Sequence, residues 1–406
     1  MQFSEDSTRL LKHLIPKFKN FYSDDNSLNG IDKLSGIYTD IVSGDKYYEN
    51  IKKKIDIKFV DKSGIEEPDS INSSQYSQRV KEYIKTNGKS QFVFKFNILN
   101  REIAVYFTMF NEEDINDIEI YNKYIRLIVI WLFMCNKYST SNCSKTLNVF
   151  FYLTPFPKML PNNKNKVISY ENINTGMTYR CVPNNEIFIY RAEEWFKVFI
   201  HETFHSYGLD IDVHDSNALG SIVEEMFPIK STFNIAEAYT ETWARILNCC
   251  FASYETMKEK NIDEFNLYLQ FSIQSEKMFS LMQLKKILGH MDLTYENLWS
   301  STQISEYMRT NLYREESNVF SYFVLTGIFM NDFESFIQWC DTNNTSFIKY
   351  KKSHTSVHKF GKLISSMYKS KHLIQNIHNT VIPNHKNNKY QILKNTGRMT
   401  CIEIKI

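Results

Sequence analysis

The amino-acid sequence predicts an α+β fold in which a mixed α/β part is followed by a mainly helical half. Two observations predict it. Strand-like runs rich in aromatic and β-branched residues are concentrated between residues 91 and 190, whereas helix-length periodic runs dominate after Arg191. The chain has 406 residues, 43% of them hydrophobic, so it can bury a sizeable core and is not mainly disordered.

The first part of the chain begins with a helix and loops. Apolar residues at helical spacing predict a helix over Thr8–Tyr22, and polar residues predict a loop at Asp24–Asn29 and a linker at Asp61–Ser77. Two β-rich runs flank the short segment Leu99–Arg101. They predict a hairpin over Gln91–Phe110.

A long helix is then predicted over Glu112–Tyr138. Its apolar run, Leu127–Cys135, is too short to span a bilayer, so it predicts a buried helix. The next segments are predicted to be a strand, a loop and two short strands, at Thr146–Leu153, Pro155–Tyr170, Met177–Arg180 and Glu186–Tyr190.

The remainder is predicted to be mostly helical. Helical spacing occurs at Ala192–Tyr207, Asn234–Phe251, Glu264–Leu288, Ser305–Tyr313, Asn318–Met330 and Lys359–Tyr368. The last residues, Gln391–Ile406, are predicted to be extended. These patterns divide the chain into an N-terminal helical and loop extension (1–80), an α/β core (81–255) and a helical C-terminal subdomain (256–406).

Composition limits the classes of partner and compartment. The net charge is +2, which does not favour a nucleic-acid binder or a polybasic membrane protein. The seven cysteines are odd in number and lack a C-x-x-C pair, so no disulfide framework is predicted and a reducing compartment is favoured. The N-terminus lacks the apolar core of a secretory signal, so we expect a cytoplasmic or other intracellular location. The abundance of Asn, Ile, Lys and Tyr is typical of AT-rich coding, as in many parasites and large DNA viruses.

One motif carries chemistry. Residues 201–205 read H-E-x-x-H inside the predicted helix Ala192–Tyr207. Four helical residues turn the chain by roughly 400°, so His201 and His205 lie on one face, where two imidazoles can bind one Zn²⁺. Glu202 lies beside them and can accept a proton from water at the metal. A chance match is expected in roughly 0.01 of chains of this composition.

The motif resembles that of zincin metallopeptidases. The residues around it, Val198 to Ile200 and the inner pair Thr203 and Phe204, are uncharged, as in that group. The resemblance implies a zincin-like catalytic domain in the core at 81–255, followed by the helical half. A catalytic zinc site needs a third protein ligand, and two patterns compete for it.

The first pattern is that of metzincins. The segment from His201 to Gly208 is similar to the start of H-E-x-x-H-x-x-G-x-x-H, but Ile211 stands where the third histidine belongs. Asp210, Asp212 and His214 are close to that position and out of register.

The second pattern is that of gluzincins, in which a glutamate on a later helix completes the site. The segment Asn234–Ala244 carries Glu237 and Glu241 on one helix face. The resemblance implies that Glu237 is the third ligand and that Glu241 orients a ligand imidazole. Glu241, Asp212 and His214 remain alternative third ligands.

The resemblance also implies a mechanism. Zinc would activate water, with Glu202 as general base, and a further donor would stabilise the oxyanion. The candidate donors are Tyr239, Tyr313, Tyr322, His354 and His358. The substrate backbone would pair with an edge strand above the active-site helix, which Met177–Arg180 or Glu186–Tyr190 could supply.

The function that these residues favour is a zinc metallopeptidase, an endopeptidase acting on a protein or peptide substrate, with neither nucleic acid nor membrane as partner. Two other functions remain open. One is a catalytically inactive structural or interaction protein on a zincin fold, which would have no need of Glu202. The other is a zinc hydrolase that acts on a non-peptide amide through the same site.

Overall fold

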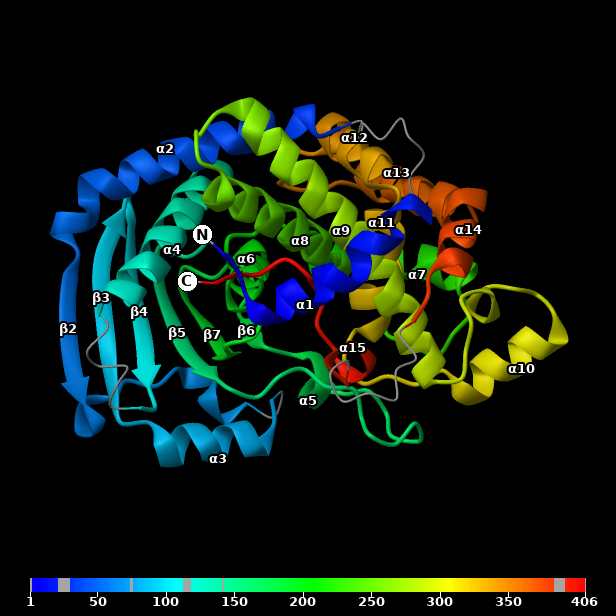
Figure 1. The fold of residues 1–406 in the computed structure, drawn as a ribbon, viewed down its shortest axis with the longest axis horizontal. Helices are drawn as coiled ribbons and strands as arrows, with labels where there is room; N and C mark the ends of the chain where they lie inside the picture. The colour runs from blue at the N-terminus through cyan, green and yellow to red at the C-terminus, as the bar shows by residue number, and fades with distance from the viewer. Residues whose placement is uncertain are drawn as a thin grey trace.

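A six-stranded mixed sheet fills one end of the molecule, and helices fill the other (Figure 1). The computed structural model describes residues 2–20, 30–73, 76–111, 118–140, 142–382 and 391–405. The predicted α+β architecture is confirmed. The predicted loop Asp24–Asn29 and residues 112–117 of the predicted helix Glu112–Tyr138 lie outside the described residues.

The sheet has the strand order β2-β3-β4-β5-β7-β6. Its first three strands are antiparallel, β4, β5 and β7 run parallel, and β6 lies antiparallel to β7 at the edge. A separate pair, β1 with β8, brings the two ends of the described chain together. The strands are β1 (Gln2–Phe3), β2 (Asp56–Asp61), β3 (Ser90–Ile98), β4 (Arg101–Met109), β5 (Thr146–Thr154), β6 (Gly176–Thr178), β7 (Asn184–Arg191) and β8 (Ile404–Lys405).

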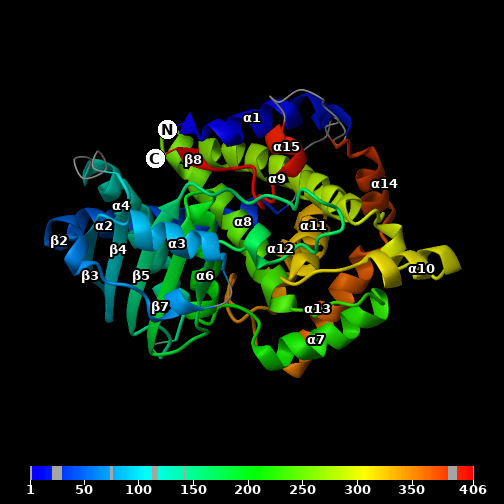
Figure 2. The ribbon, with the colours of Figure 1, turned by 90° about the horizontal axis from the view of Figure 1, so that it is seen from below.

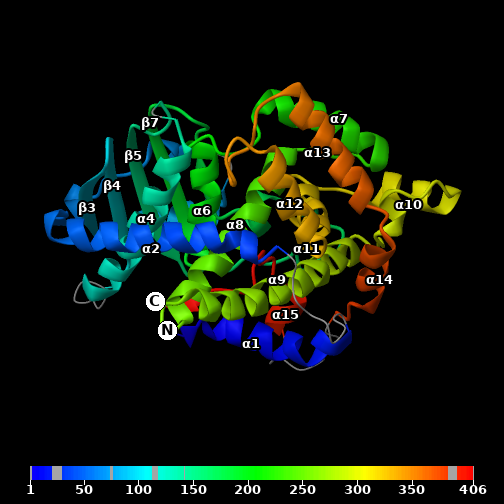
Figure 3. The same cartoon turned by 90° about the horizontal axis from the view of Figure 1, so that it is seen from above.

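The strand predictions are confirmed where apolar patterning is strong. The β3–β4 hairpin turns at Leu99 and Asn100, and Leu99 takes the positive φ of 53° that such a two-residue turn requires. The central strands β5 and β7 are largely buried, as expected for parallel strands covered on both faces. The views in Figures 2 and 3 show helices on both sides of the sheet.

The helices account for most of the remaining chain, and α10 projects from the end farthest from the sheet (Figures 2 and 3). They are α1 (Glu5–Leu14), α2 (Ser35–Ile51), α3 (Gln78–Asn87), α4 (Ile118–Tyr138), α5 (Tyr170–Ile173), α6 (Trp195–Ser206), α7 (Val213–Met226), α8 (Ile235–Thr256), α9 (Ile262–His290), α10 (Gln303–Leu312), α11 (Thr326–Asn331), α12 (Phe333–Asn343), α13 (His354–Met367), α14 (Lys371–Asn379) and α15 (Gln391–Asn395). A π-helical segment, η8 (Phe320–Leu325), leads directly into α11.

The centre of the molecule is the helix pair α6 and α8. Every residue of α6 is buried, because α6 packs against β7 and β6 on one side and against α8 on another. The apolar run Leu127–Cys135 lies on α4, and most of its side chains are buried, as predicted. No helix in the described ranges is both long and apolar enough to cross a membrane.

The structure corrects the prediction for the end of the chain. Residues 391–395 form α15 instead of an extended segment, and Leu393 inserts into the core. The chain from Thr396 onward is irregular until β8. Its amides are satisfied by buried carboxylates: Glu194 accepts from Met399, and Glu276 accepts from Ile402. We call residues 396–403 the C-terminal segment.

The structure also corrects the expectation for the cysteines. Cys143 and Cys181 form a disulfide. They are 38 residues apart in sequence, so no local sequence pattern predicted that they would pair. Cys143 precedes β5, and Cys181 lies between β6 and β7; the topology of the sheet brings them together. The other five cysteines are free and buried.

The stretch predicted as a linker, Asp61–Ser77, is held against the sheet over its described residues, 61–73 and 76–77. It contains two short 3-10 turns, at Lys62–Gly64 and Asp69–Asn72, and the amides of Asp69 and Ser70 donate to Glu186 on β7. Tyr76 packs in a second apolar cluster with residues of α3 and of the sheet. The predicted division at residues 80 and 255 stays a prediction.

Candidate metal centre

The two histidines of the motif meet on one face of α6. The helix ends where Gly208 adopts a φ of +63°, the left-handed conformation that commonly closes a helix. The Nε2 atoms of His201 and His205 lie 3.2 Å apart, as the four-residue spacing predicts. Both side chains are almost fully buried.

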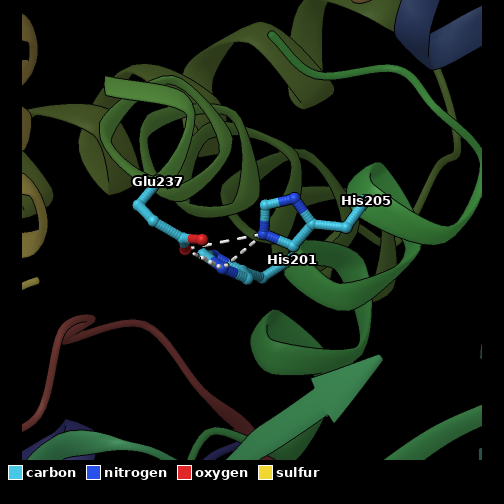
Figure 4. Close-up of side chains that lie close together, drawn as sticks. All are labelled: His201, His205 and Glu237. Atoms are coloured by element: carbon cyan, nitrogen blue, oxygen red, sulfur yellow. Dashed lines mark hydrogen bonds and ion pairs between the residues drawn. The ribbon is translucent and has the colours of Figure 1, made fainter. Parts of the chain in front are cut away.

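Glu237 comes from the neighbouring helix and joins them. Its Oε2 lies 3.0 Å from Nε2 of His201 and 3.5 Å from Nε2 of His205 (Figure 4). Ala236 and Ala238 on either side of Glu237 are fully buried. One atom from each of the three residues lies within 4.8 Å of the others, so the cluster could hold a metal ion.

Each imidazole is oriented by a carboxylate behind it. Nδ1 of His201 lies 3.1 Å from Oε2 of Glu241, and Nδ1 of His205 lies 2.7 Å from Oδ2 of Asp210. A nitrogen that donates to a carboxylate fixes the tautomer and leaves the opposite nitrogen, Nε2, as the free lone pair. Both lone pairs therefore point toward Glu237.

Glu241 is fully occupied in this orienting position. Nζ of Lys197 donates to both of its oxygens, at 2.9 and 2.8 Å, and Nε of Arg245 donates to Oε1 at 3.0 Å. With His201, these contacts satisfy the whole carboxylate. The geometry favours Glu241 behind His201 rather than as a ligand.

The charges of the cluster favour a cation. Burial alone would lower the pKa of His205, but the carboxylates of Glu237 and Asp210 outweigh it and raise that pKa to about 10. Burial also opposes the charge on Glu237, yet the two imidazoles hold its pKa well below the usual range. Without metal, His205 therefore carries a proton at the site of the cation. A metal ion that displaces this proton would meet two imidazole nitrogens and one ionised carboxylate oxygen, a donor set that fits a divalent metal ion.

Glu202 lies beside a small cavity next to the cluster. The cavity has a volume of about 40 Å³, which is enough for a water molecule, and its lining includes His201, Glu202, Tyr322 and Gly176. No described residue hydrogen-bonds to the Glu202 carboxylate, and burial raises its pKa. Glu202 is therefore placed to exchange a proton with whatever occupies the cavity.

The edge strand β6 packs directly on this residue. A Cβ atom on Gly176 would lie 3.0 Å from Cγ1 of Val198 and 3.1 Å from Oε1 of Glu202. Glycine at the start of β6 thus permits the strand to approach α6 closely. Of the two candidate edge strands, the segment Met177–Arg180 overlaps β6, whereas Glu186–Tyr190 lies in β7, inside the sheet.

One of the five candidate donors lies at the cluster. Tyr322, on the π-helical segment η8, donates from its hydroxyl to Oε2 of Glu237 at 2.9 Å. The hydroxyl of Tyr239 donates to the carbonyl of Ile348, and that of Tyr313 donates to Glu315. His354 and His358 are exposed on α13. π-Helical turns are often found at functional sites, which fits the position of Tyr322.

The other alternative ligands lie apart from this cluster. Asp212 caps the N-terminus of α7 by accepting from the amide of Asp215, and His214 is exposed. Asp212, His214 and Asp215 form a second, more exposed group whose ligand atoms also lie within 4.8 Å of one another. Ile211 is buried, and its carbonyl accepts from Arg180.

Three residues at the site have roles that sequence reasoning did not assign. Asp210 orients His205, Lys197 neutralises Glu241, and Arg180 contacts two acids at once. Nη1 of Arg180 lies 3.0 Å from Asp210, and Nη2 lies 3.5 Å from Glu237. Lys197 stands four residues before His201 on the same helix face, and that spacing is the one signal that could have indicated it.

Comparisons of the chain with protein-family models, with curated proteins and with solved structures found no significant match.

Proposed function

We propose that this chain is a zinc metallopeptidase with a zincin-type catalytic domain and a gluzincin-type ligand set. His201, His205 and Glu237 hold the zinc, and Glu202 is the general base. The observation that carries the proposal is the convergence of two Nε2 atoms and one carboxylate oxygen within 4.8 Å, beside the buried Glu202. Catalytic zinc sites take three protein ligands of these types and keep a fourth position open.

The metal supplies one part of the chemistry: when bound, Zn²⁺ polarises a carbonyl group and makes a neighbouring water more acidic. Glu202 supplies the next part. It accepts the proton of the attacking water and delivers it to the leaving amine. Burial raises the pKa of Glu202, so its carboxylate is a stronger base than an exposed one.

Two other features support a peptide substrate. The strand β6 is an edge strand beside Glu202, and an extended peptide can add to such an edge through main-chain hydrogen bonds. Tyr322 lines the same cavity, and its hydroxyl, which donates to Glu237 in the structure, would be a donor for the charge that develops on the carbonyl oxygen once it turns from that carboxylate. Asp210 and Glu241 keep the two imidazoles oriented throughout.

The test is the substitution Glu202→Gln in the zinc-loaded protein. We expect cleavage of a diverse fluorogenic peptide library by the wild type, and a loss of at least about 10²-fold in the variant, with zinc content unchanged. Glu225→Gln, at an exposed glutamate on α7, is the matched control and should cleave like the wild type. Equal cleavage by the Glu202→Gln variant, or a zinc-loaded wild type that cleaves no peptide, would overturn the proposal. The second result would favour an inactive scaffold or a non-peptide amide as substrate.

A further inference from the structure

The disulfide lies at the end of the active-site helix. A Cβ atom on Gly208 would lie 3.2 Å from Sγ of Cys143 and 3.3 Å from Sγ of Cys181, so the disulfide packs directly on the glycine that ends α6. The amide of Cys181 also donates to the carbonyl of His205 at 3.1 Å. The disulfide is thus joined to the backbone of a candidate zinc ligand.

Arg180, which directly precedes Cys181, reaches into the metal centre. One guanidinium nitrogen lies 3.0 Å from Oδ2 of Asp210, the same oxygen that lies 2.7 Å from Nδ1 of His205. Another lies 3.5 Å from Oε1 of Glu237. Arg180 therefore contacts one candidate ligand and the carboxylate that orients a second.

The backbone that carries Arg180 is held in an unfavourable conformation. Cys181 has a φ of +42° and Ser144, next to Cys143, has a φ of +49°. Residues other than glycine rarely occupy this left-handed region and do so where the surroundings hold them there. The disulfide and the hydrogen bond from the amide of Ser144 to the carbonyl of Val182, 2.8 Å, join these two segments. Without the covalent bond, the segment that carries Arg180 can relax away from Asp210 and Glu237.

We propose that Arg180 is a positioning residue for the metal centre, that the Cys143–Cys181 disulfide holds it in place, and that reduction of the disulfide loosens the bound metal. This inference rests on the proposed function, because it concerns the zinc that His201, His205 and Glu237 would hold. It makes the oxidation state of one cysteine pair a control on the proposed activity.

Reduction of the disulfide requires a two-electron reductant, such as a dithiol. Cys181 is exposed, whereas Cys143 is buried, so a thiolate attacks Sγ of Cys181 and Cys143 leaves as a thiolate. The second thiol of the reductant then attacks the mixed disulfide, and Cys181 leaves as the second thiolate. Two electrons pass from the dithiol, which becomes a cyclic disulfide, to the protein. In reducing compartments, disulfides of this kind are usually redox-responsive and not structural.

The experiment measures the rate of zinc release from the zinc-loaded full chain into excess chromogenic chelator. The oxidised protein is compared with protein reduced by a water-soluble phosphine, and with the double variant Cys143→Ala and Cys181→Ala, which adds no new thiol ligand. We expect release about 10-fold faster after reduction and in the double variant, as for loss of groups that orient metal ligands. The phosphine should have no effect on the double variant.

Arg180→Gln tests whether the disulfide acts on the bound metal through Arg180. Oxidised Arg180→Gln should release zinc about as fast as the reduced wild type, and reduction should add less than about twofold, because both changes remove the same contacts. Arg180→Lys should release zinc more slowly than Arg180→Gln. Arg9→Gln, at an exposed arginine on α1 paired with Glu5 and Asp6, is the control and should behave like the wild type. Unfolding of the zinc-free forms in denaturant should show no large difference between Arg180→Gln and the wild type.

Two results would overturn this inference and leave the proposed function standing. One is zinc release that is unchanged by reduction of the folded protein. The other is effects of reduction and of Arg180→Gln that multiply, which would show that they act separately. An oxidised wild type that binds no zinc would instead overturn the proposed function, and the inference with it.

Discussion

The two imidazoles of the candidate metal centre are supported by different kinds of structure. On what we call the helical side, His201 is backed by Glu241 on α8, which pairs with Lys197 and Arg245; these three side chains are at most 2% exposed. On the loop side, His205 is backed by Asp210, which follows α6 and pairs with Arg180. The side chain of Arg180 is 30% exposed. Both carboxylates are buried, but the cations that pair with Glu241 are buried and the one that pairs with Asp210 is partly exposed.

Carboxylates that orient an imidazole in the same way can therefore contribute differently to the free energy of unfolding. A buried ion pair that loses one partner leaves an uncompensated charge in the core, whereas a partly exposed pair loses little because water replaces the partner. The helical side should therefore couple metal binding to stability. The loop side should adjust metal binding with a smaller effect on stability.

The largest effect on the free energy of unfolding is expected from Glu241→Ala on the helical side. It leaves Lys197 and Arg245 buried without this partner and frees Nδ1 of His201. We expect a loss of about 3–5 kcal/mol in the free energy of unfolding of the zinc-free protein, measured with denaturant, together with loss of zinc. Glu225→Ala, at an exposed glutamate on α7, should change stability by less than about 0.5 kcal/mol. A loss below about 1 kcal/mol for Glu241→Ala would remove the distinction between the two sides.

The second effect is a pH dependence of stability, and it arises where Lys286 contacts the C-terminal segment, near the helical side. Nζ of Lys286 on α9 donates to the carbonyl of Thr396 at 2.6 Å, and burial lowers the pKa of Lys286 to about 7. In the unfolded chain this lysine titrates near pH 10.4. Between pH 7 and pH 10 the unfolded state therefore binds a proton that the folded state does not, so the contribution of Lys286 to stability rises with pH.

The variant Lys286→Met isolates this contribution. The free energy of unfolding of the wild type minus that of the variant should increase by up to about 1.4 kcal/mol per pH unit from pH 7 to pH 9. Denaturant unfolding at several pH values measures it. A difference that stays constant with pH would show that Lys286 keeps its proton in the folded protein.

The smallest effect on stability is expected from Asp210→Ala on the loop side. His205 remains a ligand, but its ring loses its orienting carboxylate, so zinc affinity should fall by about 10–100-fold in competition with a chelator. The free energy of unfolding should fall by about 2 kcal/mol or less, because Asp210 is buried against His205 while its other partner, Arg180, is partly exposed. His214→Ala, at an exposed histidine nearby, should leave zinc affinity unchanged. Unaltered affinity in Asp210→Ala would mean that the loop side does not support the centre.

The sequence predicted the parts of the site that lie within one helix. The relative positions of His201, Glu202 and His205 follow from helical geometry, and Glu237 with Glu241 follow from the same four-residue spacing on a second helix. The strands β3, β4, β5 and β7 were predictable because their apolar runs are long. The identity of the metal and the peptidase activity stay predictions.

Other features depend on segments that meet only in three dimensions. Asp210 lies in the loop that follows Gly208, and Arg180 reaches it from the segment between β6 and β7. The Cys143–Cys181 pair depends on sheet topology, and α15 depends on the docking of Leu393 into the core. No periodic pattern within one element encodes these contacts, so the loop side was the part of the centre that sequence reasoning missed.

The central claim is that His201, His205 and Glu237 bind one zinc ion, and metal analysis tests it most directly. Native mass spectrometry of the purified chain after equilibration with Zn²⁺ would compare the wild type with His205→Ala and with Glu202→Gln. We expect one zinc per chain in the wild type and in Glu202→Gln, and none in His205→Ala. A folded wild type without zinc, or zinc retained by His205→Ala, would contradict it.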